Sequence, residues 1–281
     1  MTANEKANIA SFLDLAGDYL SGGFRRPREG YAFADDPADK KNPADAKFPA
    51  ETESLPELPA VTETTEQSPT GEGDSLEAVA AEIAACTRCG LCSTRTNAVP
   101  GEGMRRPLVM VIGEGPGADE DETGRPFVGR AGQLLDRMLD SKGRIGLSRN
   151  SNCYIANIIK CRPPGNRTPQ PDEITACVSY LVRQIKILKP RVILAAGNTA
   201  VKTLLDSTEG ITRLRGTFTF FRGTLLMDAD FNIPLLPTFH PSALLRDESL
   251  KAPVWEDMKA LRAKLCELDG DYAARMADIP L

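Results

Sequence analysis

Four cysteines have the spacing of a thiolate set that binds a metal. Cys86 and Cys89 form a Cys-x-x-Cys clamp, and Cys161 and Cys177 form a second pair with fifteen residues between them. Such a set can hold zinc or an iron–sulfur cluster, and the spacing leaves zinc, a cluster and no metal all open. Cys92 extends the clamp, but the fourth cysteine of a bacterial ferredoxin run is missing, so we interpret Cys92 as a bystander.

Three further side chains could handle a flat polar ring. His240, the only histidine, follows an apolar strand pattern, where a neutral imidazole could donate a hydrogen bond to a developing anion. Asn157 ends another strand pattern, and its amide offers both a donor and an acceptor. Phe127 could stack on a ring. The competing interpretations are an incidental histidine, a turn or capping asparagine, and a core phenylalanine.

A glycine-rich turn between residues 109 and 132 organises the chain. A buried-strand pattern at 109–112 leads into Gly113-Glu114-Gly115-Pro116-Gly117. Ligands bind at such strand ends in open α/β sheets. The spacing is not Gly-x-Gly-x-x-Gly, and Glu114 with the acids at 119–122 would repel phosphate, so we do not expect a dinucleotide site.

Strand and helix patterns alternate along the rest of the chain. Strands are predicted at 108–112, 153–159, 192–196 and 233–239, with a hairpin at 218–221 and 224–227. Helices are predicted at 76–85, 129–141, 172–188 (capped by Asp172), 198–205 and 254–265. This alternation predicts an α/β fold with a mostly parallel sheet covered on both faces. Parallel strands end at one edge, so we expect Glu114, Asn157 and His240 to lie there together.

The first 75 residues differ in composition from the remainder. Residues 1–75 hold 7 Lys/Arg and 15 Asp/Glu, whereas residues 76–281 hold 27 and 24. Six prolines within 33–75 predict an acidic, largely disordered linker. Residues 7–20 have helical periodicity and could pack on the main domain or dock in a partner's groove. We therefore expect an extension over 1–75, a folded domain over 76–268 and a C-terminal tail over 269–281.

The sequence carries no membrane or export signal that we recognise. No run of 18 apolar residues is present, and the amino terminus lacks a basic region followed by an apolar core. We expect a cytoplasmic monomer with no membrane association. In a reducing compartment, seven cysteines suggest metal binding or chemistry before disulfides. The excess of basic residues in the second segment is compatible with a nucleic-acid partner.

Four motifs in chain order closely resemble those of the family-4 uracil-DNA glycosylases. They are Gly-Glu-Gly-Pro-Gly at 113–117, Thr-Gly-Arg-Pro-Phe-Val-Gly at 123–129, Asn-Ile-Ile-Lys-Cys-Arg-Pro-Pro at 157–164 and Phe-His-Pro-Ser-Ala-Leu-Leu-Arg at 239–246. The resemblance covers about residues 80–268. It implies a three-layer α/β/α sandwich around a four-stranded, largely parallel sheet. It also implies a DNA-repair enzyme that flips uracil out of DNA and hydrolyses its N-glycosidic bond, leaving an abasic site.

The resemblance assigns roles to residues at the matching positions. Glu114 would position or polarise the attacking water, because Gly115 stands where the best-known branch of the superfamily has an aspartate. Asn157 would read O4 and N3 of the base, and His240 would face O2. The remaining implied roles are substrate binding by Gly113 and Gly115, exclusion of thymine's methyl by Glu120, stacking by Phe127, insertion into or bracing of the duplex by Ser242, Leu244, Leu245 and Arg246, and ligation of a 4Fe–4S cluster by Cys86, Cys89, Cys161 and Cys177.

The resemblance also implies a nucleic-acid partner for this chain. Uracil-containing DNA, double- or single-stranded, would be the substrate of a nucleoid-associated enzyme. Residues 1–75, which lie outside the resemblance, could recruit a replication or repair protein. Basic side chains near the site would hold phosphates or be ordinary solvated charges; they are Arg125, Arg130, Arg162 and Arg167. The competing function is an iron–sulfur electron carrier or redox-sensing DNA-binding protein without glycosylase activity.

Overall fold

The structure is a computed structural model that describes residues 74–140, 143–221 and 232–281. The predicted helix at 7–20, the acidic linker and the second half of the predicted hairpin, 224–227, lie outside these residues. Within them, no helix is long and apolar enough to cross a bilayer.

The described strands form one mixed sheet in the order β1-β3-β2-β4-β6-β5. Their bounds are β1 Glu102–Gly103, β2 Val109–Gly113, β3 Cys153–Asn157, β4 Val192–Ala196, β5 Thr219–Phe221 and β6 Ile233–Thr238. The four central strands, β3, β2, β4 and β6, are parallel, which confirms the predicted parallel sheet. The short strands β1 and β5 add antiparallel edges, and β5 pairs with β6.

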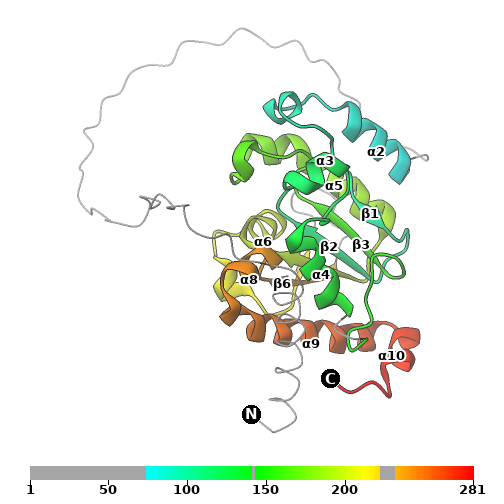
Figure 1. The fold of residues 1–281 in the computed structure, drawn as a ribbon. Coiled ribbons are helices and arrows are strands. Elements are labelled where there is room, and N and C mark those ends of the chain that lie inside the picture. The colour runs from blue at the N-terminus through cyan, green and yellow to red at the C-terminus, as the bar shows by residue number, and fades with distance from the viewer. Residues whose placement is uncertain (1–73, 141–142, 222–231) are drawn as a thin grey trace, which may run out of the picture.

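Helices follow the parallel strands and supply the two outer layers. Their bounds are α2 Leu76–Ala85, α3 Ala118–Thr123, α4 Arg130–Asp140, α5 Pro171–Leu188, α6 Asn198–Leu205, α7 Ile211–Leu214, α8 Pro241–Arg246, α9 Lys251–Leu268 and α10 Gly270–Met276, with short 3-10 turns at Gly90–Ser93, Pro164–Asn166 and Glu248–Leu250. In Figure 1, α2 lies at the top of the view, and α9 and α10, in orange and red, lie along the bottom.

The side chains of the sheet alternate between two separate cores. Val109 and Val111 of β2 face a core that also contains buried side chains of α4, α8, α9 and α10. Met110 and Ile112 face the opposite core, which contains those of α2, α5 and α6. Strands buried on both faces are typical of parallel sheets, and the predicted three-layer α/β/α sandwich is confirmed.

Most element boundaries shift by a few residues from the sequence-based expectation, and two of the differences change the description of the fold. Helix α5 begins at Pro171 rather than after Asp172, because the Glu173 carboxylate accepts the Gln170 backbone N–H at 2.7 Å and closes the first turn. Residues 269–281, expected as a tail beyond the domain, instead include α10, whose Tyr272 and Met276 are buried in the core. The folded part of the chain therefore extends past residue 268.

Candidate active site and cysteine pocket

The carboxyl ends of the parallel strands border a single large pocket. Gly113 pairs with Asn157, and Ala196 pairs with Thr238, so the segments after these strands meet at one edge of the sheet. The pocket has a volume of about 590 Å³, within the range of small-molecule sites. Its lining includes the predicted residues Glu114, Gly115, Glu120, Phe127, Asn157, His240, Ser242 and Arg246.

Asn157 carries an unpaired polar atom into this pocket. The residue is 1% exposed, and its side-chain Oδ1 has no hydrogen-bond partner. A buried carbonyl oxygen without a donor is costly, so this atom is available to accept a hydrogen bond from a group that enters the pocket. Gly113 allows the arrangement, because a Cβ there would lie 2.5 Å from Phe127 Cζ and 2.6 Å from Asn157 Oδ1. Asn157 and Phe127 therefore both lie against Gly113.

His240 presents a neutral donor beside the same ring. The Ser242 backbone N–H donates to His240 Nδ1 at 3.2 Å, so Nδ1 is an acceptor and the proton of the neutral ring is on Nε2. Burial, with a smaller contribution from Arg246, lowers the pKa of His240 to about 4. The His240 and Phe127 ring centroids are 5.5 Å apart, tilted by 35°. Asn157, Phe127 and His240 therefore share one cavity.

Phe127 is held in an uncommon backbone conformation by a side chain that sequence analysis missed. Its φ is 52°, in the left-handed region that non-glycine residues rarely adopt. The Arg149 guanidinium, 10% exposed, donates to the Phe127 carbonyl at 2.8 Å and the Pro126 carbonyl at 2.9 Å. Gly132 is needed here, because a Cβ would lie 1.9 Å from the Phe127 carbonyl oxygen. Arg149 therefore supports the backbone turn that carries the ring.

Glu120 fastens the loop that precedes α4. Its carboxylate accepts the backbone N–H groups of Val128 and Gly129, each at 2.8 Å, and of Gly117 at 3.0 Å. Three such bonds hold the carboxylate rigidly at the wall of the pocket. A role against thymine's methyl stays a prediction.

Glu114 follows β2 at the point where the strand order reverses, the usual ligand position in open α/β sheets. Its carboxylate accepts a hydrogen bond from the Thr199 hydroxyl on α6. Asn198, at the start of α6, also lines the pocket. Neither Thr199 nor Asn198 was predicted to belong to the site. Both come shortly after the predicted strand at 192–196, so the strand order could have placed them at this edge.

The predicted duplex-contacting segment divides between core and surface. Leu244 is fully buried in the core, so it anchors α8 and has no exposed side chain to insert into a duplex; a bracing role stays a prediction. Leu245 is half-buried against the same core, whereas Arg246 is exposed at the pocket. Arg246 is therefore the side chain of this segment that is best placed to meet DNA.

The four arginines expected to hold phosphates have protein contacts or lie at the surface. Arg125 pairs with Glu102 at 2.8 Å, and Arg167 pairs with Glu173 at 2.6 Å. Arg162 donates to Asn166 Oδ1 at 2.8 Å, and Arg130 is exposed at the start of α4. Arg167 also lines the pocket, so its pairing does not remove it from the site.

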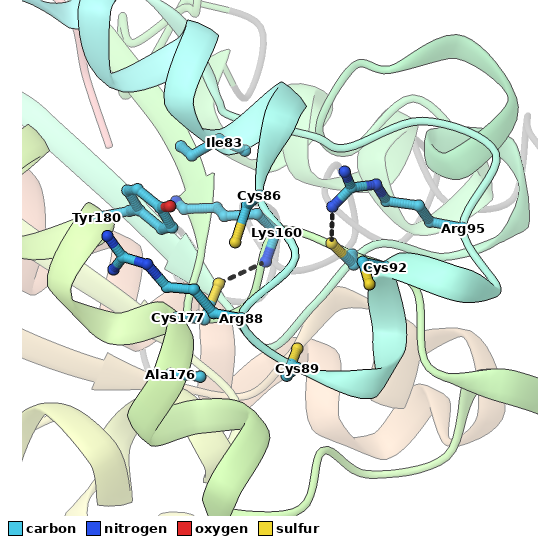
Figure 2. Close-up of a pocket in the computed structure, with 11 residues that line it drawn as sticks. Ile83, Cys86, Arg88, Cys89, Cys92, Arg95, Lys160, Ala176, Cys177 and Tyr180 are labelled. Atoms are coloured by element: carbon cyan, nitrogen blue, oxygen red, sulfur yellow. Dashed lines mark hydrogen bonds between the residues drawn. The ribbon is translucent and has the colours of Figure 1, made fainter.

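A second pocket is lined by five cysteines. Cys86, Cys89 and Cys92 come from the end of α2 and the following turn, Cys161 follows β3, and Cys177 is on α5. Figure 2 shows the labelled sulfurs around a common space. Cys92 is thus placed beside the predicted ligands rather than apart from them.

Positively charged and N–H groups face these sulfurs. Arg95 Nη1 donates to Cys161 Sγ at 3.0 Å, and the Lys160 backbone N–H donates to Cys177 Sγ at 3.3 Å. Burial raises the pKa of Cys177 to about 11, so metal binding would displace a proton. Among the described residues, no three His, Cys, Asp or Glu side chains are grouped as ligands of one metal ion.

Known proteins share this sequence pattern. A family profile described as "Uracil DNA glycosylase superfamily" matches residues 100–260. The type-4 uracil-DNA glycosylase of Sulfurisphaera tokodaii is 42% identical over 193 residues, which cover 67% of this chain and 84% of that protein. The type-4 enzyme of Thermotoga maritima is 43% identical over 191 residues, covering 67% and 93%. The chain therefore belongs to the uracil-DNA glycosylase superfamily and, within it, to the type-4 uracil-DNA glycosylases.

Proposed function

We propose that the pocket at the strand ends binds a uracil base extruded from DNA and that its side chains promote hydrolysis of the N-glycosidic bond. The family gives the activity, that of a DNA-repair hydrolase that excises uracil. The observation that supports this use of the pocket is the unpaired Asn157 amide oxygen, buried in one cavity with the Phe127 ring and the neutral His240.

Recognition would depend on the Asn157 amide. The base must leave the stack, at a cost of a few kcal/mol that is smallest for mispaired or single-stranded nucleotides. In the pocket, Asn157 Oδ1 would accept from N3–H of uracil, and the amide NH₂ would donate to O4. Cytosine presents the opposite pattern, an acceptor at N3 and an amino group at C4, so it would be rejected. The Phe127 ring would stack on the base.

Bond cleavage would depend on His240 and Glu114. As the bond between C1′ and N1 breaks, its electron pair moves to the base, and negative charge develops on O2. The Nε2–H of His240 would donate to O2, and one such donor is worth about 3 kcal/mol in a dry site. A water would then attack C1′ and lose its proton. The Glu114 carboxylate, held by Thr199, would position that water or accept the proton.

The walls of the pocket would add specificity. The Glu120 carboxylate is fixed by three backbone N–H groups, so it could not move aside for the extra methyl of thymine. Gly115 would bring its backbone close to the reacting atoms, because it carries no side chain in the pocket lining. These two roles are part of the proposal.

We propose that the second pocket holds a 4Fe–4S cluster. Cys86, Cys89, Cys161 and Cys177 would hold it, and the donors from Arg95 and Lys160 suit cluster-bound thiolates. Zinc bound by the same four thiolates, with each sulfur about 2.3 Å from the ion, is the alternative to be tested. When bound, the cluster would tie the 86–92 turn to β3 and α5 as a structural cross-link.

A visible spectrum and an iron assay of the purified protein test this cofactor. Cys161→Ser should lose the broad visible absorption and the iron, whereas Cys266→Ser, in α9, should keep both. A colourless, zinc-containing wild type would contradict the cluster proposal.

The partners follow from this activity. We propose a monomer that acts on uracil-containing DNA, double- or single-stranded, in association with the nucleoid. Residues 1–75 would recruit a replication or repair protein; pull-down of partners with and without these residues tests this role.

Release of uracil from a labelled oligonucleotide tests the main proposal. Alkali cleaves DNA at abasic sites, so the wild type should produce strand breaks at uracil and none at cytosine or thymine. Asn157→Ala is the matched control for the pocket. Wild-type breakage no greater than that of Asn157→Ala would contradict the proposal.

A further inference from the structure

Lys160 lines the cysteine pocket and also contacts the backbone of Asn157, a residue that lines the base pocket. Its side chain is 1% exposed. Its backbone N–H donates to Cys177 Sγ at 3.3 Å, and its Nζ donates to the Asn157 backbone carbonyl at 2.9 Å. One residue therefore touches a thiol of the cysteine pocket and the main chain of the base-reading asparagine.

The segment around Lys160 is tightly constrained. Its Nζ also donates to Gln184 Oε1 at 2.8 Å, and the Gln184 amide in turn donates to the Pro100 carbonyl at 2.8 Å. The Lys160 carbonyl accepts the Val99 N–H at 2.7 Å. Such a network of buried bonds leaves the ammonium little freedom to move. In Figure 2 a dashed line joins the Lys160 backbone N–H to the Cys177 sulfur, and the lysine side chain extends away from that sulfur.

The charge of Lys160 has no carboxylate partner within the described part of the chain; its Nζ contacts are a backbone carbonyl and a neutral amide. A buried ammonium without a counter-charge is costly. Lys160 lines the cysteine pocket, where its backbone N–H binds Cys177 Sγ, and a Cys177 thiolate would also attract its ammonium. A cluster held by four thiolates would carry negative charge there. The cysteine pocket thus offers the missing counter-charge.

We propose that Lys160 is a positioning residue that fixes Asn157 for base recognition and serves as a buried counter-cation for the cluster, so that the two sites are coupled through one side chain. The inference rests on the proposed function of both pockets. Lys160 does not line the base pocket, and its action on uracil passes through Asn157.

Lys160→Met tests the coupling, with Lys259→Met on α9 as the matched control. We expect Lys160→Met to lower the single-turnover rate of uracil release about tenfold, in line with the loss of one charge-assisted hydrogen bond. In an Asn157→Ala background the same change should cause no further loss. Removal of the positive charge should also make the cluster's midpoint potential more negative, whereas Lys259→Met should change neither quantity.

The outcomes separate this inference from the function itself. An equal rate loss in both backgrounds, or an unchanged midpoint potential, would overturn the coupling while leaving the glycosylase intact. A wild type that releases no uracil would instead overturn the proposed function. Lys160→Met could fail to fold or lose its iron. In that case Gln184→Glu is the second variant, because it is nearly isosteric and offers the lysine a carboxylate. It should also make the midpoint potential more negative and slow uracil release. No change in either quantity would contradict the inference.

Discussion

Thr199 donates a hydrogen bond to the Glu114 carboxylate, so the residue after β2 is held by the helix that follows β4. The two strands are neighbours at the point where the strand order reverses. The carboxylate is half-buried at the pocket, and one hydroxyl restrains its rotation. Such restraint would matter for the proposed role of Glu114 in orienting a water, because misplacement by about 1 Å can cost about a hundredfold in rate.

Thr199→Val should therefore reduce the rate of uracil release. Valine keeps the shape of threonine but removes the donor, and a hydrogen bond to a charged group is worth about 1.5–3 kcal/mol. We expect kcat to fall about ten- to a hundredfold with little change in KM. Single-turnover kinetics on a uracil-containing oligonucleotide measure this loss.

Thr199→Ser is the control, since it keeps the hydroxyl and should keep most of the activity. An equal loss in the serine and valine variants would show that packing, not the hydrogen bond, matters at this position. An unchanged rate in Thr199→Val would show that Thr199 does not position the Glu114 carboxylate.

The protonation state of His240 can be observed directly, because the chain has one histidine. Burial lowers its pKa from 6.5 to about 4, so the ring should stay neutral from pH 8 to about pH 5, with the proton on Nε2. The unfolded chain takes up this proton near pH 6.5, so His240's contribution to stability is lost as the pH falls from 6.5 towards 4. Imidazole ¹⁵N chemical shifts during a pH titration measure both the tautomer and the pKa.

Ser242→Ala is the matched variant for this titration. It removes the hydroxyl near Nδ1 but leaves the backbone N–H donor in place, so the Nε2–H tautomer should persist. A wild-type pKa near 6.5, or a proton on Nδ1, would contradict a neutral Nε2–H donor for O2 of the base.

Gly113→Ala should damage the pocket without unfolding the protein. The added Cβ would lie 2.5 Å from Phe127 Cζ and 2.6 Å from Asn157 Oδ1, so both side chains must shift. We expect a rate loss of about a hundredfold, because both recognition groups are displaced. Gly270→Ala, whose Cβ would meet nothing within 4 Å, should leave the rate unchanged. Wild-type kinetics for Gly113→Ala would show that activity does not require Phe127 and Asn157 to approach residue 113 so closely.

The sequence predicted the positions that depend on strand order and missed those that depend on side-chain contacts across the fold. Apolar runs such as 192–196 are typical of buried parallel strands, and parallel strands must end at one edge, which placed Asn157 and His240 together. The Thr199 and Lys160 contacts join segments far apart in the sequence and leave no periodic signal. The burial of Leu244 was not predicted, because a motif resemblance says nothing about which side chains of a short helix face the core.

Arg149 provides the last prediction, because it holds the Phe127 turn that the base would stack upon. Arg149→Met removes the donors to the Phe127 and Pro126 carbonyls, and the unfavourable φ of Phe127 then lacks its support. We expect weaker binding of uracil-containing DNA and a lower Tm, since the pairs with Glu102 and Asp136 are lost too. Arg125→Met is the control: it also loses a pair with Glu102, but its side chain is exposed and makes no bond to the Phe127 carbonyl. If both variants bind DNA and melt alike, the surface charge rather than the turn accounts for the effect.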